Sequence, residues 1–327
     1  MDVRLRPTRE RGLSRLNDSG RNSVGVALAA LGLVVAVWGS LILSRRQDDA
    51  ATREQAQPVT LPAEVAGFRA AAWYLPDADL LGFVEIPAGP FTMGSDPGVD
   101  SLAFDVEWWG NGRVQGVVDL PTYYVARTEV TVAQYAAFVR ASGHPIADPR
   151  ALEGAPDHPV TFVSWPDAVA YTHWLDRTLR GATSTDAELA GLLADGWRVS
   201  LPSEAEWEKA ARGADGRIYP WGAEPRRDRA NYRARGTTSV GSFPCPECPY
   251  PLADMSGNVW EWTRSPYRPY PFVDAAESID LRAEALWVMR GGSFGDPEQF
   301  VRAANRGGAD PGARRPFIGF RVALVRK

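Results

Sequence analysis

Apolar residues are concentrated in one long run near the N-terminus. Residues 24–43 are 20 positions without a single charge. A helix of that length spans about 30 Å, the thickness of the hydrocarbon core of a bilayer. Ser44, Arg45 and Arg46 follow directly, whereas a signal peptide has a shorter apolar core and a small-residue cleavage site. The pattern predicts an uncleaved transmembrane helix over residues 23–44.

Charge around this run predicts its orientation. Six arginines and three acids precede it, and an excess of arginine marks the cytoplasmic side. We therefore expect a single-pass protein of a bacterial inner membrane, with an Arg-rich cytoplasmic tail over residues 1–22. Residues 45–80 begin charged and become rich in Ala and Pro, which predicts a linker. The main domain, residues 81–327, is then expected in the periplasm.

After the predicted linker, the apolar residues are spaced as in short strands and short helices. Strand-like runs cover residues 83–94 and 122–130. Thr131, Ser164 and Ser203 are residue types that cap helices, and apolar residues follow each of them at helical spacing. This pattern predicts three helices, over residues 132–141, over 165–179, and from Ser203 to near Gly213. Eleven of the 12 Trp lie after the anchor, among many Gly and Pro, so we expect a loop-rich fold held by aromatic side chains.

Composition excludes some functions and leaves one reactive motif. Residues 1–46 carry eight Arg and three acids, so the remainder of this chain of net charge −4 carries −9 and has no basic face for nucleic acid. Cys245 and Cys248 form a CxxC motif that fits either a redox or Cu(I) site or a small disulfide. Redox CxxC motifs normally begin a helix, whereas prolines surround this one. The pattern favours a disulfide.

Four segments, in this order and spacing, resemble the formylglycine-generating enzyme, or sulfatase-modifying factor, superfamily. They are IPAGPFTMG at 86–94, LPSEAEWEKAARG at 201–213, DMSGNVWEW at 254–262, and RGGSF at 290–294 with GFRV at 319–322. The resemblance spans roughly residues 80–325 and implies an α+β domain, related to C-type lectin-like folds, with little regular secondary structure. Members include the copper-dependent oxidase, iron-dependent sulfoxide synthases, pyoverdine-maturation proteins and proteins without demonstrated chemistry.

The residues that carry catalysis in this superfamily are not all present. Asp296 and Val301 stand where the oxidase has its two copper-binding cysteines, and Ser293 matches an active-site serine that here lacks a metal or a base. His144, His158 and His173 follow no ligand spacing for iron, and no nucleophile elbow of a hydrolase appears. We expect no copper, no iron and no catalytic residue of the known kinds.

Calcium is the cofactor that the resemblance implies, in a structural role. Its ligands would be two side chains and two backbone carbonyls, those of Asp254, Glu261, Gly257 and Val259. A second family site would use the side chain of Asn231 and the carbonyl of Tyr232, but its downstream Asp has no counterpart. The alternative is that Trp260 and Trp262 pack in the core while Asp254 only caps a turn.

Two surfaces are candidates for binding a partner. The first consists of aromatic and Arg residues in predicted loops: Trp108, Trp109, Arg264, Tyr267, Arg268 and Tyr270. Such side chains could anchor an interface, or they could instead pack inside the domain. Small residues that share one face of the predicted membrane helix form a seam that another helix could approach closely: Gly25, Ala29, Gly32, Ala36 and Gly39.

Two functions remain open. The first is a non-catalytic, membrane-anchored accessory subunit that binds and stabilises an integral inner-membrane complex, for example a photosynthetic or respiratory one. The second is a periplasmic protein-modifying or cofactor-maturation enzyme of the formylglycine-generating or nonheme-iron kind. Absence of the copper cysteines and presence of the anchor favour the subunit, because a tether concentrates the domain near other membrane proteins.

Overall fold

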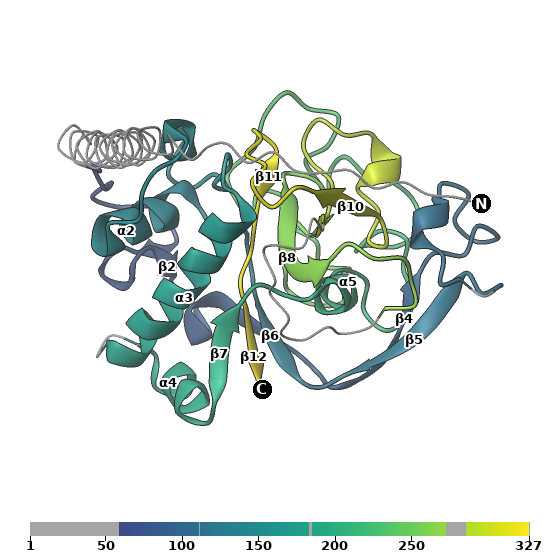
Figure 1. The fold of residues 1–327 in the computed structure, drawn as a ribbon, viewed down its shortest axis with the longest axis horizontal. Helices are drawn as coiled ribbons and strands as arrows, with labels where there is room; N and C mark the ends of the chain where they lie inside the picture. Colours follow the sequence, from purple (N-terminus) through teal and green to yellow (C-terminus); the bar gives the residue numbers. More distant parts are fainter. Residues whose placement is uncertain (1–58, 111, 183–184, 273–285, 327) are drawn as a thin grey trace, which may run out of the picture. The chain divides into compact units, whose positions relative to one another are not determined.

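Two four-stranded sheets organise the computed structural model, which describes residues 59–110, 112–182, 185–272 and 286–326. The first sheet contains, in spatial order, β3 (Phe83–Ile86), β6 (Tyr123–Ala126), β12 (Ala323–Arg326) and β7 (Trp197–Ser200). All neighbours in it are antiparallel. β12 lies between β6 and β7, so the end of the chain is held in the middle of the sheet (Figure 1).

The second sheet contains β10 (Arg306–Ala309), β9 (Trp287–Arg290), β8 (Trp260–Pro266) and β11 (Ile318–Gly319). Two hairpins complete the strands: β1 (Phe68–Arg69) with β2 (Leu75–Pro76), and β4 (Gly89–Gly94) with β5 (Gln115–Leu120). β8 and β11 are parallel, and the other pairs are antiparallel. Residues 213–259 contain only turns, bends and isolated bridges, so the α+β class and the expected long irregular segments are both found.

Within the described residues, four α-helices and five 3-10 helices accompany the sheets. The α-helices are α2 (Val132–Ser142), α3 (Trp165–Gly181), α4 (Ala187–Ala194) and α5 (Glu204–Arg212). The 3-10 helices are η1 (Ala70–Ala72), η2 (Asp79–Gly82), η3 (Asp105–Glu107), η4 (Pro149–Leu152) and η5 (Glu298–Phe300). In Figure 1, α2, α3 and α4 lie on one side of the first sheet, and α5 lies beside β8 and β9.

Local sequence accounts for three of the α-helices. Thr131, Ser164 and Ser203 each accept a hydrogen bond from the backbone N–H three residues on, and the side chain at that position bonds back to the cap. These are the three helices that the sequence predicts. α4 was not predicted; Asp186 caps it, and only Leu189 and Leu193 bury fully.

The folded unit begins earlier than the sequence suggested. Residues 59–80 were predicted as part of a linker, but they belong to the compact unit that starts at Val59. Tyr74 and Leu75 are buried, and the amide of Gln134 in α2 donates to the carbonyl of Tyr74 over 2.9 Å. A linker does not bury aromatic rings in this way, so the folded domain begins at residue 59 and not at residue 81.

The predicted membrane helix over residues 23–44 and its seam of small residues lie outside the described residues. Within the described part of the chain, no helix is both long and apolar enough to cross a membrane.

Charged side chains are buried where α5 meets the second sheet. Glu204 and Glu208 project from α5, and each has almost no exposed surface. Arg306 donates twice to Glu204, with both distances 2.7 Å, and the fully buried Arg290 donates to Glu208. Because an uncompensated buried charge is costly, these pairs fix how α5 sits on β9 and β10.

Replacing Arg290 by Met tests this arrangement. The variant leaves Glu208 without its β9 partner in a buried site, so we expect the free energy of unfolding to fall by about 3–5 kcal/mol. Urea denaturation of the purified protein, followed by Trp fluorescence, measures it. Arg69→Met is the control, because the Arg69–Asp77 pair is exposed and should contribute about 1 kcal/mol or less. Equal losses in the two variants would contradict the role given to Arg290.

Candidate functional site

Ser293, Asp296 and Trp260 meet at the turn that follows β9. One carboxylate oxygen of Asp296 accepts three hydrogen bonds: from the Ser293 amide at 2.9 Å, the Ser293 hydroxyl at 2.7 Å and the Trp260 indole N–H at 2.8 Å. The Asp296 carbonyl also accepts from the Arg233 amide. Asp296 therefore holds the turn 293–296 against β8 and against the loop that contains Arg233.

This arrangement stabilises a turn. A serine hydroxyl becomes nucleophilic when a base that is free to accept a proton lies next to it. The Ser293 hydroxyl instead donates to a carboxylate oxygen that two N–H groups already occupy. Among the described residues no histidine hydrogen-bonds to either Ser293 or Asp296.

Val301 is completely buried in a small aromatic cluster. Its neighbours there are Tyr219, Trp221, Ala230 and Tyr232, and the Tyr219 and Trp221 rings stack with centroids 5.4 Å apart. The Ser256 hydroxyl donates to the Val301 carbonyl. The backbone is tight here as well, because a Cβ on Gly292 (φ +72°) would lie 2.6 Å from the Phe300 carbonyl oxygen. Asp296 and Val301, which the sequence analysis matched to the copper cysteines, thus hold a turn and a core contact.

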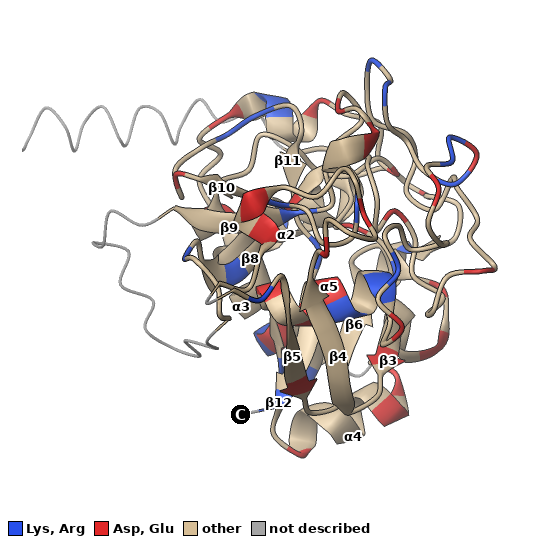
Figure 2. Cartoon of the chain, turned by 90° about the vertical axis from the view of Figure 1, so that its right-hand side faces the viewer, with Lys and Arg blue, Asp and Glu red and all other residues tan. Residues whose placement is uncertain are grey.

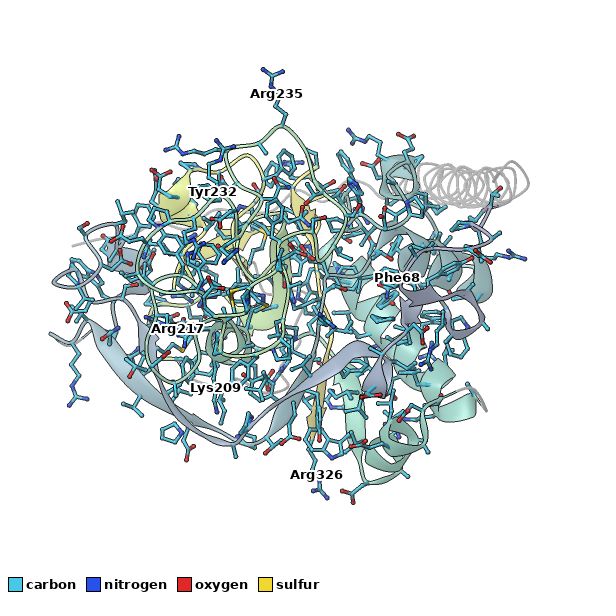
Figure 3. The ribbon with its side chains drawn as sticks, turned by 180° about the vertical axis from the view of Figure 1, so that it is seen from behind. Phe68, Lys209, Arg217, Tyr232, Arg235 and Arg326 are labelled. Carbon is cyan, nitrogen blue, oxygen red and sulfur yellow. A yellow bond between two sulfur atoms is a disulfide. The ribbon has the colours of Figure 1, made fainter. Side chains whose placement is uncertain are left out.

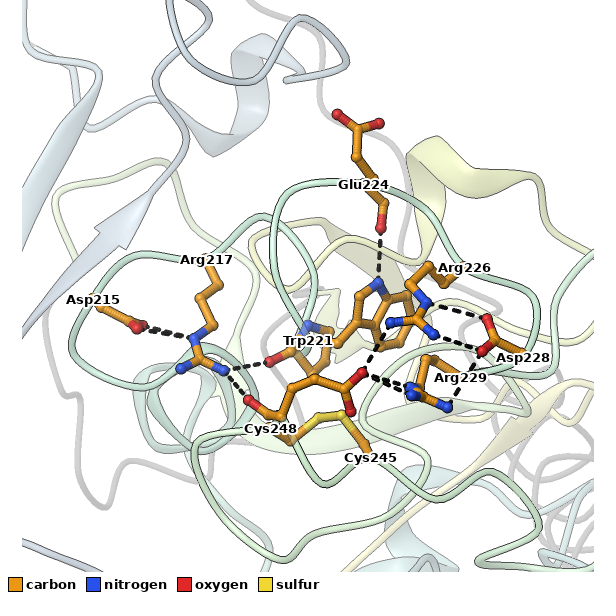
Figure 4. The surroundings of a disulfide bond; sticks show 11 residues. Asp215, Arg217, Trp221, Glu224, Arg226, Asp228, Arg229, Cys245 and Cys248 are labelled. Carbon is orange, nitrogen blue, oxygen red and sulfur yellow. Dashed lines mark hydrogen bonds and ion pairs between the residues drawn. A yellow bond between two sulfur atoms is a disulfide. The ribbon is translucent and has the colours of Figure 1, made fainter.

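Cys245 and Cys248 form a disulfide that packs against the same cluster. Figure 4 shows Arg226 and Arg229 near the disulfide, and both hydrogen-bond to Glu247, which lies between the two cysteines in the sequence. Arg229 donates twice to one Glu247 oxygen, at 2.8 and 2.9 Å, and Arg226 donates to the same oxygen at 2.9 Å. The motif braces an irregular loop, as the proline-rich surroundings suggested. It leaves the chain, which has only two cysteines, without a free thiol.

Glu129 and Asp254 form a buried pair of carboxyl groups. One oxygen of each, together with the Thr238 hydroxyl, is buried without a hydrogen-bond partner. Burial and the nearby Asp254 carboxyl raise the pKa of Glu129 well above its usual value, and burial raises the pKa of Asp254. Asn258 lies beside them and donates to the other Glu129 oxygen over 3.1 Å.

Arg321 is the cation that acts on this region, and it is already engaged. It donates to both oxygens of Glu261, each over 2.6 Å, and the Trp207 indole donates to the same carboxylate over 2.7 Å. Glu129, Asp254 and Glu261 are three acids around the guanidinium of Arg321, and Arg321 forms its ion pair with Glu261. Buried orphan oxygens of this kind suit a hard divalent cation.

The predicted calcium ligands therefore fit only in part. Asp254 has a free, buried carboxylate oxygen and fits. Glu261 does not, because Arg321 and Trp207 already use both of its oxygens. Trp260 and Trp262 are buried in the core whether or not a cation binds. No three His, Cys, Asp or Glu side chains among the described residues gather in a group that would hold a metal.

Glu129 is the residue that sequence analysis missed. It directly precedes Val130 and the Thr131 cap, in a segment that otherwise alternates like a strand, and it is fully buried. The feature of the sequence that could have identified it is an acidic residue near the end of a strand-like run. For the second predicted site, the Asn231 side chain donates to Asn258 over 3.1 Å and to the Gly236 carbonyl over 3.0 Å, so it serves this polar cluster.

The predicted interface residues do not share one exposed surface. Trp108 is 41% exposed and Arg268 is exposed. The other four are engaged within the domain: Trp109 packs on the buried Tyr270, Arg264 pairs with Glu206, and Tyr267 lies under Arg306. Charges are interspersed elsewhere too, and Figure 2 shows acidic and basic segments alternating over the visible face. In Figure 3, Arg235 points away from the domain.

A serine, an aspartate and a histidine also meet at the start of α3. The Ser164 hydroxyl donates to Asp167 over 2.7 Å, His144 approaches the other Asp167 oxygen at 3.1 Å, and Arg314 donates to Asp167 over 2.7 Å. The order differs from a catalytic triad, in which the histidine lies between the other two. Burial raises the pKa of Asp167, but hydrogen bonds from His144 and Ser164 and the charge of Arg314 lower it to about 2.

The chain is similar in sequence to a known family and to several known proteins. The family of sulfatase-modifying factor enzyme 1-like domains matches residues 75–326. The formylglycine-generating enzyme of Thermomonospora curvata is 30% identical, over 74% of this chain and 93% of its own length. The inactive C-alpha-formylglycine-generating enzyme 2 of mouse is 33% identical over 50% of this chain.

Among solved structures, PvdO from Pseudomonas aeruginosa superimposes with a TM-score of 0.59 and 27% identity, over 74% of this chain and 93% of PvdO. Not every relative is matched over its full length. The chain spans 60%, 26% and 48% of three curated relatives, the last being the mouse protein.

The cluster around Asp167 predicts a pH-dependent contribution to stability. Because the folded state lowers this pKa, the contribution is complete above the unfolded value near 4 and is lost as pH falls through about 2. Asp167→Asn should lower the free energy of unfolding by roughly 2 kcal/mol near pH 7. Denaturation of both proteins at several pH values should show the difference shrinking below about pH 4. Asp77→Asn, at an exposed site, is the control; a constant difference for Asp167 would contradict the prediction.

Proposed function

Because the chain belongs to the sulfatase-modifying factor enzyme 1-like family, we propose that it uses this fold as a non-catalytic, membrane-anchored accessory subunit of an inner-membrane protein complex. The observation that carries the proposal is the state of the two copper-ligand positions. One carboxylate oxygen of Asp296 accepts three hydrogen bonds, and Val301 is fully buried. Neither position offers a thiolate, which Cu(I) chemistry requires.

The sequence before the domain supports the same proposal. Residues 24–43 would hold the domain at a membrane, and the seam of Gly and Ala on one face of that run would let a second helix pack closely. A tether and a helix-packing surface are what a subunit needs, whereas an enzyme acting on soluble substrates needs neither.

We further propose a structural calcium ion between Glu129 and Asp254. Two buried carboxyl groups with unpartnered oxygens, and the buried Thr238 hydroxyl beside them, would be stabilised by a divalent cation. Glu261 is assigned to Arg321 in this arrangement. Calcium here would tie the strand end at Glu129 to the turn at Asp254 and would play no part in a reaction.

Extraction of native membranes in mild detergent tests the subunit proposal. We expect the protein to migrate with other membrane proteins on a native gel and to contain no stoichiometric copper or iron. A protein that migrates alone and turns over a peptide or a small thiol would overturn the proposal in favour of a protein-modifying enzyme.

Substitutions in the predicted membrane helix test how it contributes. Gly32→Leu with Ala36→Leu would fill the seam and should release the protein from its complex, because the partner helix could no longer approach. Leu28→Ala, on a bulkier face of the same run, is the control and should leave the complex intact. Retention of the complex by both variants would show that the run is only a tether.

Calcium binding is measured by thermal unfolding of EDTA-treated protein with and without added CaCl₂. At a calcium concentration of 100 times Kd, a folded-state site stabilises by about 2.7 kcal/mol. This calcium-dependent stabilisation should disappear in Asp254→Ala and in Glu129→Gln. It should persist in Asp228→Asn, because Asp228 is exposed. An unfolding midpoint that does not respond to calcium in the unaltered protein would refute the site.

A further inference from the structure

Exposed apolar side chains of the domain are concentrated in one loop. Six large hydrophobic residues are exposed among the described residues, and four of them lie in the loop 95–108 between β4 and β5. They are Val99 at 75%, Leu102 at 39%, Val106 at 43% and Trp108 at 41% exposed. Scattered exposed hydrophobics need no explanation, whereas four in one short loop mark an interaction surface.

The loop is held rigidly from beneath by one buried arginine. Arg302 is fully buried and donates to Asp100 over 2.6 Å and to Glu107 over 2.5 and 2.8 Å. Phe104 stacks on Phe300, with ring centroids 5.3 Å apart, and the Arg302 guanidinium lies over the Phe104 ring. Asp100, Phe104 and Glu107 therefore face the domain, whereas the aliphatic side chains of the loop are exposed. A surface that is ordered before binding loses little conformational entropy on binding.

Charge indicates what kind of surface the loop would meet. Residues 95–108 contain four acids and no Lys, Arg or His. Arg302 compensates Asp100 and Glu107, but no ion pair among the described residues involves Asp96, which is half-buried, or Asp105, which is exposed. The first base after the loop is Arg113. An apolar centre with an acidic border complements an apolar patch bordered by Lys or Arg, and it is repelled by an anionic lipid surface.

The length of the chain before the domain limits where that patch can be. Residues 44–58 are the 15 positions between the apolar run and the folded unit. Fully extended, they reach at most about 50 Å. If residues 24–43 span the membrane, as proposed, the domain stays close to the membrane and so do the partners that it can bind.

From these observations we propose that the loop 95–108 is the docking surface of the domain, and that its occupant is an apolar, Lys- or Arg-bordered patch on the extracytoplasmic side of an integral membrane protein. This inference rests on the proposed subunit function. It replaces the wider interface predicted from sequence, of which only Trp108 belongs to the loop. Val99, Leu102 and Val106 provide the apolar centre, and Asp96 and Asp105 the acidic border.

Two sets of full-length variants test the surface in native membranes extracted with mild detergent. Val99→Ser/Leu102→Ser/Val106→Ser removes the apolar centre, and Val117→Ser/Leu286→Ser is its control, at residues that are 72% and 46% exposed outside the loop. Asp96→Lys/Asp105→Lys reverses the border charge, with the exposed Glu85→Lys as its control. Both loop variants should lower the fraction that migrates in the complex by at least about tenfold, as loss of central interface contacts does. The controls should leave that fraction unchanged.

A photo-crosslinking residue at position 102 identifies the occupant, with position 117 as its control. The expected product from position 102 is a crosslink to a peptide of an integral membrane protein with Lys or Arg close to the crosslinked residue, and no such product forms from position 117. Crosslinks only to lipid, or only to a second copy of this chain, would overturn the inference.

The outcomes separate the two proposals. If the unaltered protein migrates alone, the subunit function fails and this inference fails with it. If the unaltered protein migrates in a complex and the loop variants do so equally, only the inference fails. Thermal unfolding of the loop variants checks that they remain folded, since all the substituted apolar side chains are exposed.

Discussion

Glu204, Glu208 and Glu261 are buried carboxylates, and each is held by an arginine from a distant part of the sequence. Arg306 holds Glu204, Arg290 holds Glu208, and Arg321 holds Glu261. These pairs join α5 and β8 to residues 290–321, a stretch that contains one 3-10 helix and only short strands. In a loop-rich fold few backbone ladders are available to set these positions. The buried charges do so instead, because none of them can lose its partner without a large cost.

The same pairs decide which chemistry is open to the domain. Arg321 and Trp207 saturate Glu261, so the acid expected to bind calcium is used to attach the C-terminal segment. The buried carboxyl groups without an arginine of their own are instead those of Glu129 and Asp254, which come from segments far apart in the chain. Asp296 and Val301, the two positions predicted to match the copper ligands, are likewise used for the turn and for the aromatic cluster against which the disulfide packs.

Arg302 links the interior to the surface. Its pairs with Asp100 and Glu107 fasten a loop whose aliphatic side chains then face outward. An unsupported loop of this composition would fold its valines and leucine inward, since exposing them is unfavourable. The buried Arg302 pairs thus order the exposed apolar loop that we propose as the docking surface.

The sequence by itself determined the features that depend on near neighbours. Thr131, Ser164 and Ser203 each begin a helix with a reciprocal cap three residues away, and proline around Cys245 and Cys248 favours a brace over a redox helix. Motif spacing likewise identified the fold. Tertiary structure alone decided that Glu261 pairs with Arg321, that Glu129 lies beside Asp254, and that Trp109 packs against Tyr270 while Trp108 is exposed. These outcomes depend on which distant groups share a low-dielectric interior, and burial and pairing across that interior leave no periodic signal in the sequence.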